Sequence, residues 1–223
     1  MLQTYLYLTA AAQKAVLVYF LAVNALYVTL FLLSLSAILD YLRRSSYRSK
    51  AEILRSKVTP PISMLVPAYN EEKTILSSSA ALFRLEYPEY EVVVVNDGST
   101  DSTLDELIRH YKLRLTKRIY HKVLPTKDVR GIYISNDPAY ARLVVVDKAN
   151  GGKADALNAG INVSRYPLFC ALDADSLLEK DSLLRVCLPF LENFRDMTAA
   201  GGIVRVANGC RIFNGVVEEV GLS

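Results

Sequence analysis

A run of 25 residues without a charged side chain, Ala15 to Leu39, constrains this 223-residue chain more than any other feature. As a helix rising about 1.5 Å per residue, it would cover about 37 Å, enough to cross a hydrocarbon core about 30 Å thick. The run is longer than the apolar core of a signal peptide, and no small-residue cleavage site follows it. We therefore predict a transmembrane helix at 15–39 rather than a buried core helix.

Basic residues follow this run directly, between Arg43 and Lys57. The segment carries six Lys or Arg and one acid, Glu52, so it is net +5 and the rest of the chain is −2. Only Lys14 precedes the run, so the positive-inside rule places residues 1–14 outside the cell and the remainder in the cytoplasm. Basic charge beside a membrane segment, or in a solvated linker, argues against a nucleic-acid-binding protein.

The cysteines and histidines do not suggest a metal site. Cys170, Cys187 and Cys210 form no CxxC pattern, and we interpret them as buried apolar side chains in a reducing compartment. His110 and His121 lack metal-ligand spacing, and both are expected at the surface.

Strand-like and helix-like runs alternate after a basic juxtamembrane linker, residues 40–59, which ends at Pro60-Pro61. Strands are expected at 62–67, 91–95, 143–146, 168–172 and 202–206, and helices at 71–85, 104–111, 153–163 and 181–194. Asn70 is a candidate N-cap for the first of these helices, and residues 113–142 are expected to be an irregular connection. The alternation predicts an α/β domain over residues 60–223 with a mainly parallel sheet. Ligands of such sheets bind at the carboxyl ends of the strands.

Two polar motifs follow the first two predicted strands. In PAYNEE, residues 67–72, the proline and tyrosine can form a flat slot for a base, and Glu71 can accept hydrogen bonds from sugar hydroxyls. An ordinary turn with acids in the first helical turn explains this motif equally well. In NDGSTD, residues 96–101, Asp97 follows four valines and can accept a hydrogen bond from a pyrimidine base or a ribose hydroxyl. A capped turn with Gly98 at positive φ explains the later residues but not Asp97.

A third motif, KANGGKADALN at residues 148–158, combines glycines with a lysine at a predicted helix start. Backbone N–H groups of Gly151 and Gly152, with the charge of Lys153, could bind a pyrophosphate. The alternative is a glycine-rich turn with a solvated lysine. The segment is not a Walker A loop, because Ala154 stands where that loop needs Ser or Thr.

The fourth motif, LDADS at residues 172–176, brings two acids to the end of a strand. In an extended segment Asp173 and Asp175 would project side by side, and their mutual repulsion would favour a bound cation. Oxygen ligands suit Mg²⁺ or Mn²⁺. The alternative is a surface turn with two solvated acids. Taken together, the four motifs supply the parts of a site for a nucleoside diphosphate.

The motifs PAYNEE, VVVNDGSTDST, NGGKADALNAG and LDADS, in this order behind a membrane helix, resemble those of family 2 glycosyltransferases. The resemblance spans about residues 60–206 and is strongest to membrane synthases of chitin, hyaluronan, cellulose and poly-N-acetylglucosamine. It implies a GT-A fold, a UDP-sugar donor, Mn²⁺ or Mg²⁺, and inverting transfer to a glycan or lipid-linked acceptor at the cytoplasmic face of the cell membrane. The resemblance also implies that Asp175 is the metal ligand of the DxD motif. The nucleotide-sugar-binding residues that it implies are Pro67, Ala68, Tyr69, Glu71, Asp97, Lys153 and Asp173.

The sequence departs from this family in its last residues. The catalytic base of an (E/T)D-type motif, the Q-x-x-R-W motif and further membrane helices are not found, and Glu218 and Glu219 lack the expected context. We therefore expect a fragment that binds donor and metal but transfers sugar poorly. Alternatives are a polyprenyl-phosphate glycosyltransferase, a non-catalytic nucleotide-sugar-binding module, and a nucleotidyltransferase, which would need a glycine-rich basic loop after the first strand.

Overall fold

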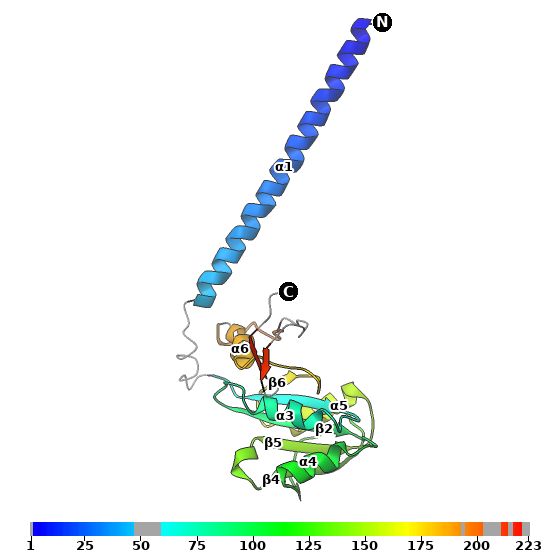
Figure 1. Ribbon diagram of the computed structural model, residues 1–223, viewed down its shortest axis with the longest axis vertical. Coiled ribbons are helices and arrows are strands. Elements are labelled where there is room, and N and C mark those ends of the chain that lie inside the picture. The colour runs from blue at the N-terminus through cyan, green and yellow to red at the C-terminus, as the bar shows by residue number, and fades with distance from the viewer. Residues whose placement is uncertain (1, 47–58, 193–194, 203–210, 214–215, 220–223) are drawn as a thin grey trace. The chain divides into compact units, whose positions relative to one another are not determined.

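The computed structural model describes residues 2–46, 59–192, 195–202, 211–213 and 216–219. The chain divides into two compact units, Met1–Glu52 and Ile53–Ser223 (Figure 1). The first contains one long helix, and the second contains a sheet with helices on both faces.

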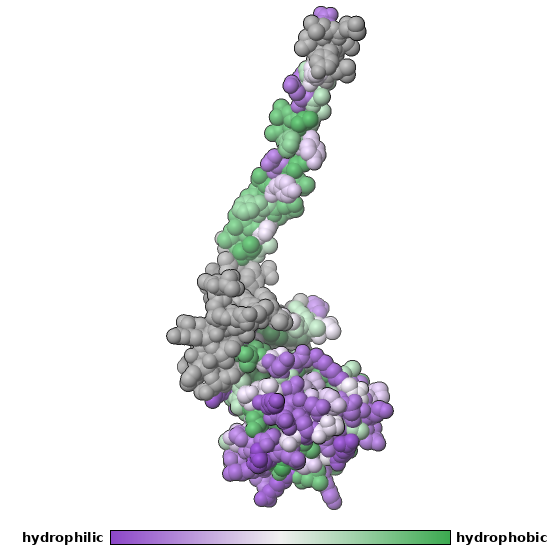
Figure 2. Space-filling view, turned by 45° about the vertical axis from the view of Figure 1, so that its right-hand side comes forward, coloured by the Kyte–Doolittle hydropathy of each residue, from purple (hydrophilic) through white to green (hydrophobic). Residues whose placement is uncertain are grey.

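Helix α1, Leu2–Ser46, contains the predicted apolar run and extends beyond it at both ends. Its stretch Thr9–Asp40 is long and apolar enough to cross a membrane, with a mean hydropathy of 2.3. Apolar side chains cover much of the side of this helix that Figure 2 shows, and the six consecutive residues from Val16 to Leu21 are all exposed, so this part of the helix has no buried face. Asn24 and Thr29 donate hydrogen bonds to the carbonyls of Phe20 and Ala25, each at 2.8 Å. These polar groups are thus satisfied within the helix, as an apolar surrounding requires.

Among the described residues, six strands form the main sheet, in the order β3-β4-β5-β2-β1-β6. The strands are β1 Ile62–Ala68, β2 Tyr90–Asp97, β3 Leu113–Thr116, β4 Val129–Ser135, β5 Leu143–Lys148 and β6 Leu168–Ala171. The pairs β5–β2, β2–β1 and β1–β6 are parallel, whereas β3–β4 and β4–β5 are antiparallel. The predicted mainly parallel α/β sheet is confirmed.

Strand β2 lies inside the sheet, and all its residues are buried. Val92 and Val94 face one hydrophobic cluster, which contains residues of helices α3, α4 and α6. Val93 and Val95 face a second cluster, which contains residues of α5. A run of β-branched residues suits such a strand, because neither face meets water.

The helices of this unit are α3 Ile75–Leu82, α4 Thr103–Tyr111, α5 Lys153–Val163 and α6 Ser182–Glu192. All four lie within or close to the predicted segments, but the first begins later than expected. The prediction of Asn70 as its N-cap is wrong: Asn70 has a left-handed backbone with φ +56°, and its side chain accepts a hydrogen bond from the N–H of Thr100 at 2.8 Å. A turn at residues 72–74 therefore separates Asn70 from α3.

The segment 113–142, expected to be irregular, contains β3, β4 and the short 3-10 helix Pro138–Tyr140. These strands were missed because β3 is only four residues long and both are partly exposed, so neither gives a continuous apolar run. Two further strands, β7 Arg211–Phe213 and β8 Val216–Glu219, form a separate antiparallel pair. The predicted strand at 202–206 falls almost wholly outside the described residues.

His110 and His121 are both exposed, as expected. Cys187 is buried and Cys170 is partly buried, and neither is in a disulfide. Burial raises the pKa of both thiols, which keeps them protonated and unreactive near neutral pH. Cys210 lies outside the described residues.

Candidate functional site

The four sequence motifs follow strands β1, β2, β5 and β6, which are mutually parallel, so all four lie at the carboxyl edge of the sheet. Direct contacts join each motif to the next. Asn70 of the first motif donates its backbone N–H to the Ser99 hydroxyl of the second at 3.0 Å. Asp97 of the second accepts hydrogen bonds from the third, and Lys153 of the third forms an ion pair with Asp173 of the fourth. The structure thus brings all four motifs into one site.

The first two loops are held together by reciprocal hydrogen bonds. The N–H of Glu72 donates to Asp101 at 3.1 Å, and the N–H of Ser102 donates to the Glu72 carboxylate at 3.2 Å. Asp101 also accepts the N–H of Thr103 at 3.0 Å, at the start of α4. These loop acids therefore have structural partners, in agreement with the simpler explanation of a capped turn.

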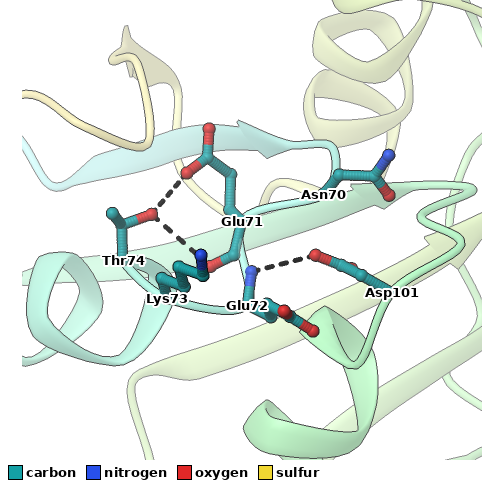
Figure 3. Close-up of a pocket in the computed structure, with 6 residues that line it drawn as sticks. All are labelled: Asn70, Glu71, Glu72, Lys73, Thr74 and Asp101. Carbon is teal, nitrogen blue, oxygen red and sulfur yellow. Dashed lines mark hydrogen bonds between the residues drawn. The ribbon is translucent and has the colours of Figure 1, made fainter.

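A pocket lies against these loops, and Figure 3 shows the residues that line it. Its lining residues come from the first two motifs and the turn before α3: Asn70, Glu71, Glu72, Lys73, Thr74 and Asp101. Of the predicted binding residues only Glu71 lines it, and the Glu71 carboxylate accepts a hydrogen bond from Thr74. Pro67 is half-buried and Ala68 is buried, whereas Tyr69 is 50% exposed and free to stack on a planar group.

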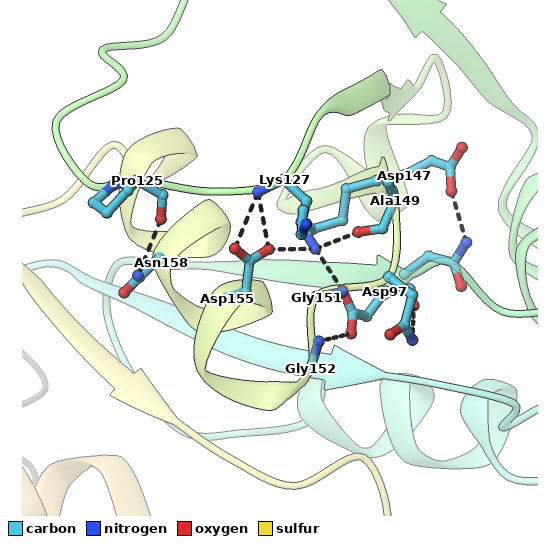
Figure 4. Close-up of polar contacts among 12 residues, drawn as sticks. Asp97, Pro125, Lys127, Asp147, Ala149, Gly151, Gly152, Asp155 and Asn158 are labelled. Carbon is cyan, nitrogen blue, oxygen red and sulfur yellow. Dashed lines mark hydrogen bonds and ion pairs between the residues drawn. The ribbon is translucent and has the colours of Figure 1, made fainter.

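Asp97 lies at the end of β2 with its side chain almost wholly buried (Figure 4). Its carboxylate accepts hydrogen bonds from the N–H groups of Gly151 and Gly152 at 3.0 and 2.7 Å. It also forms an ion pair with Lys148 at 2.5 Å. The two glycine N–H groups that were expected to bind pyrophosphate thus bind a carboxylate of the protein itself.

Lys148 is the last residue of β5, and its side chain has no exposed surface. Its ammonium contacts Asp97 and Asp155, each at 2.5 Å, and donates to the carbonyl of Ala149 at 2.6 Å. Three acceptors match the three N–H bonds of an ammonium group, which is what a buried lysine needs. The third sequence motif included Lys148 and Asp155, but neither was predicted to have a role. A lysine that directly ends a buried strand was the available signal.

Asp155 projects from the first turn of α5 toward Lys148 and toward the backbone N–H of Lys127, at 3.0 Å. Burial pushes the pKa of this carboxyl up, but the hydrogen bonds from Lys148 and Lys127 outweigh burial and hold the pKa below its ordinary value. Asp155 is therefore ionised at neutral pH. Lys148 and Asp155 together fix the strand ends, the start of α5 and the segment before β4 to one another.

Gly98 makes the close approach of two motif loops possible. Its φ is +68°, and a Cβ there would lie 2.6 Å from the backbone nitrogen of Asn150. Asn150 in turn donates its side-chain amide to the carbonyl of Asp97 at 2.9 Å. Any larger residue at position 98 would therefore push the third motif away from Asp97.

Asp173 and Asp175 lie in a turn beyond the end of β6 rather than in an extended segment. The two carboxylates were predicted to project side by side because residues i and i+2 of an extended segment point the same way. This relation does not apply in a turn. Both residues are exposed; Asp173 is paired with Lys153, whereas no described residue pairs with Asp175. Within the described part of the chain, no three His, Cys, Asp or Glu side chains cluster as a metal site. Carboxylates of this kind fit Mg²⁺ or Mn²⁺ only with phosphate oxygens or water as further ligands.

This arrangement defines a class of protein: an α/β domain whose polar loops meet at the carboxyl edge of a mainly parallel sheet. The family model for "Glycosyl transferase family 2" matches residues 63–132 and 133–214. The chain belongs to this family, and the expected GT-A fold is confirmed.

Several curated proteins are similar to this chain. Poly-beta-1,6-N-acetyl-D-glucosamine synthase of Staphylococcus epidermidis is 31% identical over 147 residues, which cover 66% of this chain and 29% of that protein. The enzyme of the same name from Staphylococcus aureus strain COL is 30% identical over 142 residues, which cover 64% and 27%. The alignments thus span less than a third of the length of these relatives.

Two solved structures are also similar. A fragment of S. aureus TarS in complex with UDP-GlcNAc is 25% identical, with a TM-score of 0.44 over 60% of this chain and 32% of that one. The mannosyltransferase PcManGT of Pyrobaculum calidifontis, in complex with GDP-Man and Mn²⁺, is 25% identical, with a TM-score of 0.42 over 67% and 38%.

Proposed function

We propose that the chain binds a UDP-sugar with Mn²⁺ or Mg²⁺ and supplies the donor half of a site that transfers the sugar, with inversion, to a glycan or lipid-linked acceptor. One observation carries this proposal: contacts running from Asn70 to Asp173 join the four motifs into one site at the carboxyl edge of the sheet. Ligands of parallel α/β sheets bind at this edge.

The described side chains have suitable chemistry for such a donor. Tyr69 is exposed beside Glu71 and can stack on a uracil ring. Asp97, at the end of the neighbouring strand, is almost wholly buried and bonded to Lys148 and two glycine N–H groups, so it would contact the uracil only if one of these bonds opened. Lys153 is exposed at the start of α5, where its charge and the helix N-terminus both favour a diphosphate. Asp175 has an exposed carboxylate for a cation. That cation would neutralise the leaving diphosphate.

The ion pair between Lys153 and Asp173 is exposed on both sides. Such pairs are weak, because water and salt screen them. A diphosphate could therefore take over Lys153 at little cost, and leave Asp173 for the nucleotide or the cation. Pro67 and Ala68 would support the base slot through the backbone of β1.

The membrane location is part of the same proposal. Helix α1 has a membrane-span candidate at Thr9–Asp40, and basic residues follow it. We place residues 1–14 outside, the helix at 15–39 across the cell membrane, the linker at 40–59 and the GT-A domain at 60–223 in the cytoplasm. The relatives' name, poly-beta-1,6-N-acetyl-D-glucosamine synthase, supports a polysaccharide acceptor over a polyprenyl phosphate.

Calorimetric titration of the detergent-solubilised chain with UDP tests this proposal. Binding should require Mn²⁺, disappear on addition of EDTA, and weaken in Asp175→Asn. Asp105→Asn, at an exposed acid on α4, is the matched control and should bind as the wild type does. Metal-independent binding, or equal binding by both variants, would contradict the assignment of Asp175. No binding by the folded wild-type chain would contradict the donor site itself.

A further inference from the structure

The connection between α4 and β4, residues 112–130, carries a concentrated positive charge. It contains seven Lys or Arg and one acid, Asp128, so it is net +6 in a chain of net +3. The sequence-based interpretation placed the basic charge of this protein in the segment after the apolar helix. Residues 112–130 are a second basic segment. Five of the basic side chains are exposed on the part of the connection outside β4: Lys112, Arg114, Lys117, Lys122 and Lys127.

Large aliphatic side chains are exposed on the same connection. Ile119 is 93% exposed, Val123 80% and Leu115 66%. Tyr120, by contrast, packs against the hydrophobic cluster beneath α5. Tyr120 is thus turned inward, whereas Leu115, Ile119 and Val123 are turned outward. Exposed aliphatic groups that alternate with basic groups are typical of surfaces that bind a membrane or a partner.

The backbone that presents these side chains is held in place by α5. Asn162, itself buried, accepts the N–H groups of Val123 and Leu124 at 3.0 and 2.9 Å, and donates to the carbonyl of Leu124 at 2.9 Å. Arg118 donates to the carbonyl of Val163 at 3.0 Å. Figure 4 shows a further hydrogen bond, from Asn158 to the carbonyl of Pro125. The outward positions of Ile119 and Val123 are therefore fixed by hydrogen bonds and do not arise from a loose loop.

We propose that residues 112–130 form a surface that binds an anionic lipid bilayer, with Ile119 and Val123 inserted at the level of the headgroups and the basic side chains on lipid phosphates. Charge complementarity favours this partner, because each Lys or Arg near an anionic membrane gains attraction. A nucleic-acid surface would instead be expected to expose aromatic rings for stacking. The same chain also carries a membrane-span candidate in α1, so a bilayer is a partner within its reach.

A single tryptophan reports this contact, because the natural chain contains none. Val123→Trp is introduced into the full chain, which is placed in nanodiscs of phosphatidylcholine alone or mixed with phosphatidylglycerol. In the anionic discs the emission should shift to the blue, and lipids brominated on their acyl chains should quench it. Ala139→Trp is the control, since Ala139 is exposed near the opposite end of β4 and its emission should respond to neither.

Charge reversal tests whether the basic side chains are needed for the contact between this surface and anionic lipid. In the Val123→Trp chain, Lys117→Glu with Lys122→Glu should abolish the shift and the quenching in anionic discs. Lys73→Glu with Arg109→Glu, at exposed positions elsewhere, changes the net charge equally and should preserve both signals.

Three results would overturn the proposal. They are unquenched emission in anionic discs, a shift that depends on protein concentration without lipid and so reports self-association, and a shift caused by an oligonucleotide but not by lipid. None of these readouts depends on UDP binding, so the proposed function and this surface can fail separately.

Discussion

Replacing Lys148 by methionine should destabilise the protein by about 3–5 kcal/mol, the usual cost of removing one partner from a buried ion pair. Methionine keeps the length and most of the volume of the side chain, so packing is largely preserved. The charge is lost, however, from a position with no exposed surface and in contact with Asp97 and Asp155, each at 2.5 Å. The two carboxylates, 4% and 21% exposed, would then lack their cation.

Urea unfolding of the full chain in detergent, followed by near-ultraviolet circular dichroism of its tyrosines, measures this loss. Arg109→Met is the matched control, because it removes an ion pair with Glu106 in which Arg109 is 75% exposed. That variant should lose no more than about 1 kcal/mol. Adding Asp155→Asn to Lys148→Met should restore part of the loss, because one unpaired carboxylate is removed. Equal losses in Lys148→Met and Arg109→Met would refute the argument that a buried cation organises the site.

Three further variants test other parts of the structure. Because the pKa of Asp155 is held below its ordinary value, the folded protein binds fewer protons than the unfolded chain. The wild-type free energy of unfolding should therefore fall as pH drops below about 5, and Asp155→Asn should show a shallower fall in urea titrations at several pH values. Gly98→Ala should weaken UDP binding and lower the melting temperature, since its Cβ would meet Asn150; an unchanged melting temperature would contradict this. Asn162→Ala removes three hydrogen bonds to the 112–130 segment and should cost about 1–3 kcal/mol, with faster amide exchange at residues 123–124. Exchange unchanged from the wild type would show that other contacts fix this segment.

The parallel part of the sheet was predictable from sequence because its strands are buried on both faces. Their central residues, Val92–Val95 and Leu143–Val146, are therefore continuous apolar runs, and each run is followed by polar residues. Strands β3 and β4 gave no such signal, because they are partly exposed and pair antiparallel at one side of the sheet. Partial exposure mixes polar and apolar residues, so a strand then looks like a loop.

The position of the site was also predictable, but its internal contacts were not. The sequence places Asp97, Gly151 and Gly152 after parallel strands, and so at one edge. It does not reveal that Asp97 itself accepts the glycine N–H groups, because that depends on how the chain turns at Gly98 and Gly152, both at positive φ. The N-cap assignment of Asn70 failed for a similar reason, since its side chain bonds to a loop 30 residues away.

The measurement that tests the account most directly is hydrogen–deuterium exchange of the full chain with and without UDP and Mn²⁺. If the four motifs form one donor site, UDP should slow exchange in all four together, at residues 67–72, 96–101, 149–153 and 172–176, and leave α4 unchanged. Protection confined to a single motif, or absent from all of them while UDP is bound, would contradict the assignment of this edge of the sheet as the donor site.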